Sequence, residues 1–236
     1  MHTVTARQMH ALDNPIWNAL STLHAHFAEG DSLAKRYPPA VTTLAAMGAP
    51  TREAYSSVAQ VLKGSGAALF LDQPPTVPAG WITIHASQLI QMVCEEPETS
   101  AASQLASDSA AQTLTIADTD EMVALAELTK PGPFGTRTRE LGHYLGIRES
   151  NRLVAMAGER LHLPGYTEVS AVCTHPGSQG RGYARHLMAI LMREIAQRGE
   201  IPILHVRQEN VSAIRLYEKL GFRTRRLLHF IVLRPV

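Results

Sequence analysis

Cysteine is scarce in this chain: only Cys94 and Cys173 occur among its 236 residues. The two lie in unrelated sequence contexts, so we expect no disulfide framework of the kind that stabilises small secreted domains. The longest apolar runs, such as LMAILM at 187–192, are far too short to span a membrane. The first ten residues also lack the basic-then-apolar order of a secretory signal. We therefore expect a cytoplasmic protein with reduced thiols and no membrane partner.

Long runs of positive charge are missing as well. No run of Lys or Arg exceeds two residues, and the basic residues are interleaved with acidic ones. This pattern argues against nucleic acid as a partner. The charge is nevertheless uneven, because residues 1–112 hold five Lys/Arg against nine Asp/Glu, whereas residues 113–236 hold 17 against 12. We therefore expect a site for an anionic ligand in the second half.

Metal-ligand spacing is absent too. The 11 histidines are scattered, and neither cysteine has a partner at the spacing of a zinc site. His24 and His26 stand two residues apart, and we interpret them, like the other histidines, as hydrogen-bonded or solvated residues. We expect no bound metal.

Residues 97–112, PETSAASQLASDSAAQ, are small and polar and have the composition of a linker. They divide the chain into a predicted N-terminal lobe, 1–112, and a second domain, 113–236. In the lobe, residues 15–30 have helical spacing of apolar residues, and Thr51 is a predicted N-cap of a second helix. AALFLD and WITIHASQLIQMV are predicted strands. The lobe is therefore expected to be a smaller α+β unit, and it carries no motif that indicates chemistry.

After the boundary the predicted elements alternate more clearly. Apolar patterning and turn residues predict strands at 113–117, 143–150, 152–163, 167–175, 201–206 and 229–235, with helices at 118–130, 180–199 and 210–221. The first two of the longer strands form a predicted hairpin around Asn151. This order indicates an α/β (α+β) fold in which a mixed, mostly antiparallel central sheet is covered by helices.

One loop stands out, QGRGYA at 179–184, between a strand and an amphipathic helix. Backbone N–H groups at a glycine-rich turn and the positive end of the helix dipole make such a place an anion site. The Walker pattern is excluded because it requires Gly-Lys-Ser/Thr, and here Gly182 precedes Tyr183. The dinucleotide fingerprint matches poorly, because Arg185 occupies its last glycine position. A structural alternative is that the glycines only shape a tight connection.

Residues 179–184 match the (Gln/Arg)-x-x-Gly-x-(Gly/Ala) pyrophosphate loop of the GNAT acetyltransferase superfamily. Downstream, ENVSAIRLYEKLGF at 209–222 resembles the second signature of that family, a helix capped by Asn, bearing Leu-Tyr and ending at Gly-Phe. The resemblance covers residues 113–236. Within the superfamily it looks closest to a branch related to glycine N-acyltransferases, in which an N-terminal region, often a degenerate copy of the same fold, precedes the catalytic domain.

This resemblance implies the GNAT fold and an acyltransferase that uses acetyl-CoA, without a metal. It further implies that strand 168–174 is bulged and separates from strand 201–206, so that its edge binds the pantetheine arm. The Val172 N–H would then polarise the thioester carbonyl. The implied cofactor-binding residues are Val172, Cys173, Thr174, Gln179, Gly180, Arg181, Gly182, Tyr183, Ala184, Arg185, Asn210 and Ala213.

Two residues are predicted to catalyse acyl transfer. Glu168 stands at the place of the catalytic glutamate in some GNAT members and would deprotonate the amine, which is otherwise charged at neutral pH. The alternative is that Glu168 forms an ion pair with Arg160 or another cation of the sheet. Tyr217 occupies the Leu-Tyr position and would protonate the departing thiolate; the alternative is a half-buried aromatic residue.

Two further side chains have a structural alternative. Asn210 is an N-cap as well as an implied cofactor contact, and the cap alone would explain it. Cys173 raises the possibility of an acyl-cysteine intermediate. No histidine is spaced to activate this thiol except His175, and strand alternation turns the Cys173 side chain away from those of Val172 and Thr174. We therefore interpret Cys173 as structural.

The acceptor is predicted less specifically, as a small-molecule or peptide amine. Residues 128–144 wall the acceptor pocket in the family, and there Phe134 would supply an apolar rim while Arg137 and Arg139 would meet a carboxylate. A solvated loop is the alternative, and the acidic N-terminal half could instead attract a cationic acceptor such as a polyamine. The predicted function is an N-acetyltransferase that acts by direct attack in a ternary complex. The rival is a non-catalytic acyl-CoA sensor or partner-binding module on the same fold.

Overall fold

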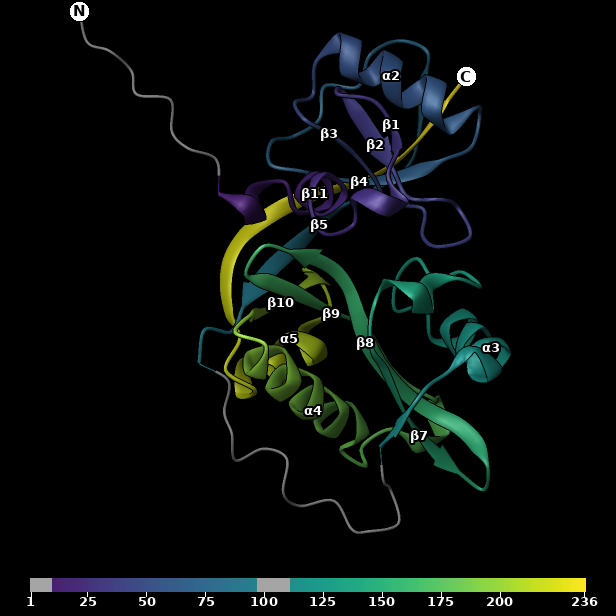
Figure 1. Ribbon diagram of the computed structural model, residues 1–236, viewed down its shortest axis with the longest axis vertical. Coiled ribbons are helices and arrows are strands. Elements are labelled where there is room, and N and C mark those ends of the chain that lie inside the picture. The colour runs from purple at the N-terminus through teal and green to yellow at the C-terminus, as the bar shows by residue number, and fades with distance from the viewer. Residues whose placement is uncertain (1–9, 97–110) are drawn as a thin grey trace, which may run out of the picture.

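The computed structural model describes residues 10–96 and 111–236, and its main element is an eight-stranded sheet (Figure 1). In spatial order the strands are β4 (Ala67–Leu71), β11 (Arg223–Pro235), β5 (Trp81–Val93), β10 (Ile201–Arg207), β9 (Tyr166–Thr174), β8 (Arg152–Leu163), β7 (Tyr144–Glu149) and β6 (Gln112–Thr113). Neighbouring strands pair antiparallel, except that β9 and β10 pair in parallel. The predicted fold class is therefore confirmed.

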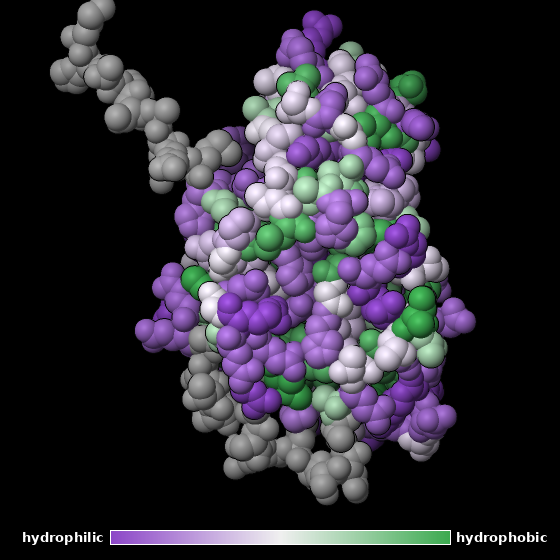
Figure 2. Space-filling model, viewed as in Figure 1, coloured by the Kyte–Doolittle hydropathy of each residue, from purple (hydrophilic) through white to green (hydrophobic). Residues whose placement is uncertain are grey.

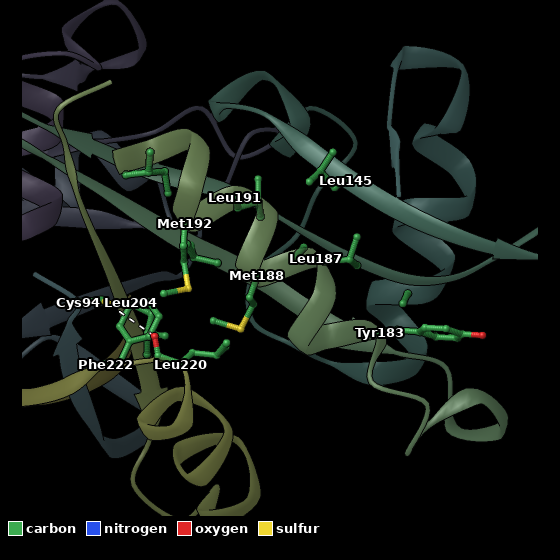
Figure 3. Packing of buried hydrophobic residues seen from close by; sticks show 14 of the residues in the cluster. Cys94, Leu145, Tyr183, Leu187, Met188, Leu191, Met192, Leu204, Leu220 and Phe222 are labelled. Atoms are coloured by element: carbon green, nitrogen blue, oxygen red, sulfur yellow. Dashed lines mark hydrogen bonds between the residues drawn. The ribbon is translucent and has the colours of Figure 1, made fainter. Parts of the chain in front are cut away.

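Helices cover both faces of this sheet. They are α3 (Thr119–Thr129), α4 (Tyr183–Gln197) and α5 (Val211–Lys219). The apolar stripe of α4, which includes Leu187 and Leu191, is buried against one face together with Leu204 of β10 (Figure 3). On the opposite face α3 packs over Ala171 and Cys173 of β9. The second half of β9 therefore has a helix on each face of the sheet.

The N-terminal region adds a second, smaller sheet. It consists of β1 (Glu29–Gly30), β2 (Ala34–Arg36) and β3 (Ala45–Met47), with α1 (Pro15–Ser21) and α2 (Arg52–Leu62) beside it. Thr51 caps α2 as predicted, since its hydroxyl accepts a hydrogen bond from the Ala54 N–H. The helix predicted over 15–30 is shorter, because it ends at Ser21 and a 3₁₀ turn follows. The pattern did not predict the three short strands.

Strands from both sides of the predicted boundary share the main sheet. β5 lies between β10 and β11 and is hydrogen-bonded to both, and β4 forms the edge beyond β11 (Figure 1). A buried cluster also joins Leu12, Ile16 and Leu20 to Leu161 and Ile203 of the sheet. The division at 112 stays a prediction, and residues 97–110 of the proposed linker lie outside the described residues.

The other predicted elements differ mainly at their ends. The strand predicted at 113–117 is reduced to Gln112–Thr113, because Thr115 caps a 3₁₀ turn at Ile116–Asp118. The hairpin of β7 and β8 turns at Ser150 and Asn151, both with positive φ, as the Asn-centred turn predicts. Apolar and polar residues are intermixed over the face seen in Figure 2. None of the described helices is long and apolar enough to cross a membrane.

Candidate active site

β9 and β10 stay together only at their beginning. Their parallel pairing covers Tyr166–Glu168 and Ile201–Ile203, and no pairing between them follows. β9 also carries a bulge, because Ala171 has φ +52° and the register with β8 shifts between Ser170 and Cys173. An extra residue in one strand bends it and increases its twist. The predicted bulge, and the separation of this strand from 201–206, are therefore confirmed.

Two adjoining cavities open where the strands separate. One, of about 510 Å³, lies toward the main sheet, and the other, of about 390 Å³, lies toward the loop before α4. They share the lining residues Val172, Cys173, Thr174, Gln179, Asn210 and Tyr217. We treat them as one cleft and name its parts the sheet end and the loop end. Every residue predicted to bind the cofactor lines the loop end, so the structure brings this set together.

The loop itself has the geometry of an anion site. Gly180 and Gly182 have φ of +78° and +81°, a left-handed conformation that is strained for any residue with a Cβ. α4 begins directly after Gly182, so its first N–H groups have no partner within the helix and its dipole is positive there. Arg185, in the first turn of α4, is exposed and has no side-chain partner among the described residues. An anion in the loop end would be close to both the free backbone N–H groups of α4 and the positive charge of Arg185.

Glu149, which the sequence did not single out, holds this loop. Its carboxylate accepts hydrogen bonds from Ser178 Oγ at 3.0 Å, from Arg181 Nη1 at 2.8 Å and from Tyr183 Oη at 2.6 Å. The side chains of Arg181 and Tyr183 are therefore engaged, and these residues offer a ligand mainly their backbone. Glu149 ends β7, 30 or more positions before the loop, so no local spacing could have revealed it.

Asn210 caps α5 as predicted. Its Oδ1 accepts a hydrogen bond from the Ala213 N–H at 3.2 Å. The Nδ2 group has no partner among the described residues and remains able to donate to a ligand. Asn210 lines both cavities, so the cap and the predicted cofactor contact are compatible in one residue.

Tyr217 and Cys173 both line the part of the cleft that its two ends share. Burial, and to a lesser degree Cys173, raise the pKa of Tyr217 to about 12, so its hydroxyl keeps a proton that it can donate. Burial raises the pKa of Cys173 to about 11, which keeps the thiol protonated and weak as a nucleophile. Both groups therefore stay protonated, which suits Tyr217 as a proton donor and speaks against Cys173 as a nucleophile.

Glu168 is fully buried beneath the sheet end and does not line the cleft. Arg160 donates two hydrogen bonds to its carboxylate, from Nε at 2.8 Å and from Nη2 at 2.6 Å, and His205 Nδ1 lies 2.7 Å from the same group. Burial alone would raise the pKa of Glu168, but the charge of Arg160 and the hydrogen bonds from Arg160 and His205 outweigh it and lower the pKa to about 2. These contacts are those of the ion-pair alternative, and they leave the carboxylate no direct path to an amine.

Phe134 and Arg137, the residues predicted to contact the acceptor, do not line the cleft. Phe134 packs edge-on against Tyr144 in a buried cluster, at 5.9 Å between ring centroids. Arg137 is exposed and forms a bidentate pair with Glu140. The backbone after α3 explains the difference, because Pro131, Gly132 and Pro133 reach the cleft and the chain then turns away.

The sheet end is lined instead by side chains from distant parts of the sequence. Phe70 of β4 and Phe230 of β11, 5.9 Å apart between ring centroids, form an apolar part of its wall. Lys130 and Arg207 add two cationic side chains that have no partner among the described residues. Of the described residues that line this end, none is Asp or Glu. The sheet end therefore carries uncompensated positive charge beside an aromatic wall.

Comparison with known proteins agrees with this architecture. The family model described as FR47-like protein matches residues 144–231, which include β9, the loop and α5. A solved structure of a putative GNAT-family acetyltransferase from Novosphingobium aromaticivorans is 35% identical and has a TM-score of 0.87. That alignment covers 97% of this chain and 100% of the other. The chain therefore belongs to the GNAT family of acetyltransferases.

More distant similarities are partial. A GCN5-related N-acetyltransferase from Kribbella flavida shares the fold, with a TM-score of 0.62 at 15% identity and coverage of 94% and 95% of the two chains. Mycothiol acetyltransferase of Mycobacterium marinum is 36% identical over 87 residues, 33% of this chain and 27% of that one. N-alpha-acetyltransferase RimI of Mycobacterium tuberculosis is 38% identical over 100 residues, 39% and 62% of the two chains. The chain thus spans less than two thirds of each of these two curated relatives.

Proposed function

We propose that this protein transfers an acetyl or small acyl group from acyl-CoA to a primary amine, by direct attack in a ternary complex. The observation that carries the proposal is the cleft itself. It joins an anion-binding loop, the free edge of β9 and the Tyr217 hydroxyl in one continuous space. Acyl transfer needs a held thioester, a polarised carbonyl and a proton for the leaving thiolate, and these three features supply them.

The loop end would hold the cofactor. The N–H groups of residues 180–185 and the dipole of α4 suit the pyrophosphate, with Arg185 as an added charge. The pantetheine arm would lie along β9 from Val172 to Thr174, where β10 no longer pairs with it. In this pose the Val172 N–H faces the thioester carbonyl, and Tyr217 stands on the other side of the cleft beside the sulfur.

Glu168 has a different part in this proposal from the one its position in the sequence suggested. A fully buried carboxylate that is bound by Arg160 and His205 is a weak base and is closed off from the amine. The amine would lose its proton to water in the open cleft. The positive charges of Lys130 and Arg207 favour that loss, because nearby like charge lowers the pKa of an ammonium group.

The same charges favour one class of acceptor over the other. A polyamine or another strongly cationic acceptor would be repelled by Lys130 and Arg207, and no carboxylate among the described lining residues would offset this. An amine with an additional anionic group would be attracted to them. This favours an amino-acid-like acceptor whose carboxylate would be bound by Lys130 and Arg207. The sequence pattern had assigned that contact to Arg137. The resemblance to the glycine N-acyltransferase branch, and to a degenerate N-terminal copy of the fold, remains part of this proposal.

A turnover assay tests the proposal. The purified chain is mixed with acetyl-CoA and a panel of amines, including amino acids and their amides, and release of free thiol is followed. We expect thiol release with at least one amine, and a loss of about 100-fold in kcat for Tyr217→Phe with acetyl-CoA affinity unchanged. Tyr166→Phe is the control, because Tyr166 lies outside the cleft. Tight acetyl-CoA binding without thiol release from any amine would favour the sensor on this fold instead.

A further inference from the structure

A chain of polar side chains crosses the sheet beneath the cleft and leads into the N-terminal region. It begins with Arg160 and Glu168 and continues through His205 and Gln91 to Arg225 and Asp13. Beyond Glu168 the distances are 2.7 Å from Glu168 Oε1 to His205 Nδ1, 3.0 Å from His205 Nε2 to Gln91 Nε2, 2.8 Å from Gln91 Oε1 to Arg225 Nη1 and 2.7 Å from Arg225 Nη2 to Asp13 Oδ1. Gln91 is fully buried, and only 1% of the His205 side chain is exposed.

The hydrogen bonds of Gln91 determine which nitrogen of His205 carries the proton. Arg225 can only donate, so the Gln91 oxygen must face it and the Gln91 amide nitrogen must face the other way. That nitrogen donates to the Leu12 carbonyl oxygen at 2.9 Å and to His205 Nε2. Nε2 is therefore the acceptor, and the ring proton sits on Nδ1, where it is donated to Glu168. The N-terminal region thus fixes the tautomer of a histidine in the wall of the cleft.

The bond between Glu168 and His205 lies at a particular point of the sheet. Glu168 is the last residue of β9 that pairs with β10, opposite Ile203, and His205 stands two residues further along β10. The side chains therefore continue the connection between the two strands where the backbone pairing has stopped. Val172 follows on β9, whereas Tyr217 stands on α5, which follows β10. The distance between these two residues depends on how far β9 and β10 separate.

We propose that His205 is a positioning residue that fixes the opening between β9 and β10, and that Gln91, Leu12 and Asp13 of the N-terminal region hold it there. This inference rests on the proposed acyl transfer, and it assigns the N-terminal region a part in that reaction. Without the Gln91 amide, the ring loses one of its two anchors and the opening is no longer fixed. Val172 and Tyr217 would still bind their parts of the thioester, but in poorer alignment for attack.

Steady-state kinetics of Gln91→Leu test the proposal. A small misalignment of reacting groups is costly in rate, so we expect kcat to fall about tenfold while KM for acetyl-CoA stays within about twofold. Gln88→Leu is the matched control, since Gln88 lies on the same strand and its side chain makes no hydrogen bond with the described residues. Asp13 is the partly exposed last member of this row of hydrogen-bonded side chains, so its loss should disturb folding less. We expect Asp13→Ala to lower kcat about threefold.

Nitrogen-15 NMR of the histidine rings provides a second readout, which does not depend on turnover. In the wild type we expect His205, assigned by the signal missing in His205→Gln, to show a protonated Nδ1 and an unprotonated Nε2. In Gln91→Leu this pattern should broaden or shift, and in Gln88→Leu it should persist.

The kinetic and NMR measurements together distinguish failure of the inference from failure of the proposed function. A wild type that binds acetyl-CoA but acetylates no amine contradicts the proposed function. An active wild type with Gln91→Leu equal to it in kcat overturns the positioning role. A proton on Nε2 of His205 in the wild type overturns the inference whatever the activity is.

Discussion

The loop end and the sheet end of the cleft are built in opposite ways. The loop end comes from one short stretch, residues 172–185, to which α5 and its cap add Asn210, Ser212, Ala213, Leu216 and Tyr217. What it offers a ligand is mainly backbone, because Glu149 engages the side chains of Arg181 and Tyr183. The sheet end is made of side chains from strands and loops that lie far apart in the sequence, and beneath it lies a buried ion pair.

This difference has consequences for how each end responds to change. A backbone site depends on conformation, so it is sensitive to what replaces a glycine and tolerant of most side-chain changes. A site above a buried ion pair depends on both charges being present. Removal of one partner leaves the other charged and without a partner in the protein interior. The predictions below separate these two kinds of dependence.

Glu168→Gln should have the largest effect on stability. The substitution leaves Arg160 buried without its counter-charge, and we expect the free energy of unfolding to fall by about 3–5 kcal/mol. Denaturant unfolding measures it. The loop end does not depend on this pair, so the folded fraction of Glu168→Gln should still bind acetyl-CoA.

The control for this variant is Glu29→Gln, which breaks an ion pair with Arg36 that is partly open to solvent, with an N–O distance of 2.8 Å. Exposed pairs contribute little, so this change should cost less than about 1 kcal/mol. Equal losses in the two variants would contradict the account of the sheet end.

Low pH should weaken the same Glu168–Arg160 ion pair, and it should do so gradually. The pKa of Glu168 is about 2 in the folded chain and has a usual value of 4.5, so below pH 4.5 the unfolded chain binds the proton first. The stabilisation from the ionised Glu168 is therefore complete above pH 4.5 and is lost as the pH falls toward 2. Thermal unfolding from pH 6 to pH 2 should show a steeper loss in the wild type than in Glu168→Gln. Parallel curves would mean that Glu168 does not carry this pH dependence.

The same contrast explains what the sequence could predict. The residues alone predict the anion-binding loop before α4 and the Asn210 cap, since glycines, a following helix and an N-cap act through local backbone geometry. The wider set of cofactor-binding residues, such as Val172 and Ala213, followed from the resemblance. The bulge and the separation of β9 followed from the resemblance. The sheet end was not predictable, because Phe70, Lys130, Arg207 and Phe230 meet only through the tertiary fold.

Glu168 illustrates the limit of the sequence most clearly. Its place along the strand suggested a base, and Arg160 was the recognised alternative partner. Only the folded structure adds His205 and Gln91, from strands on either side of the predicted boundary. The strand that carries Gln91 was predicted, but a strand pattern does not say which neighbours it will join in the sheet. The sequence therefore did not reveal that β5 contributes a side chain beneath the cleft.

Calorimetric titration of acetyl-CoA into the wild type and into Gly182→Trp tests the central claim most directly. Gly182→Ala, which shares the backbone strain at φ +81° but adds only a methyl group, is the control. The account predicts micromolar binding in the wild type, a loss of about 100-fold or more in Gly182→Trp, whose indole fills the loop end, and a loss of less than about tenfold in Gly182→Ala. A folded wild type that does not bind acetyl-CoA, or a Gly182→Trp variant that binds it equally well, would contradict it.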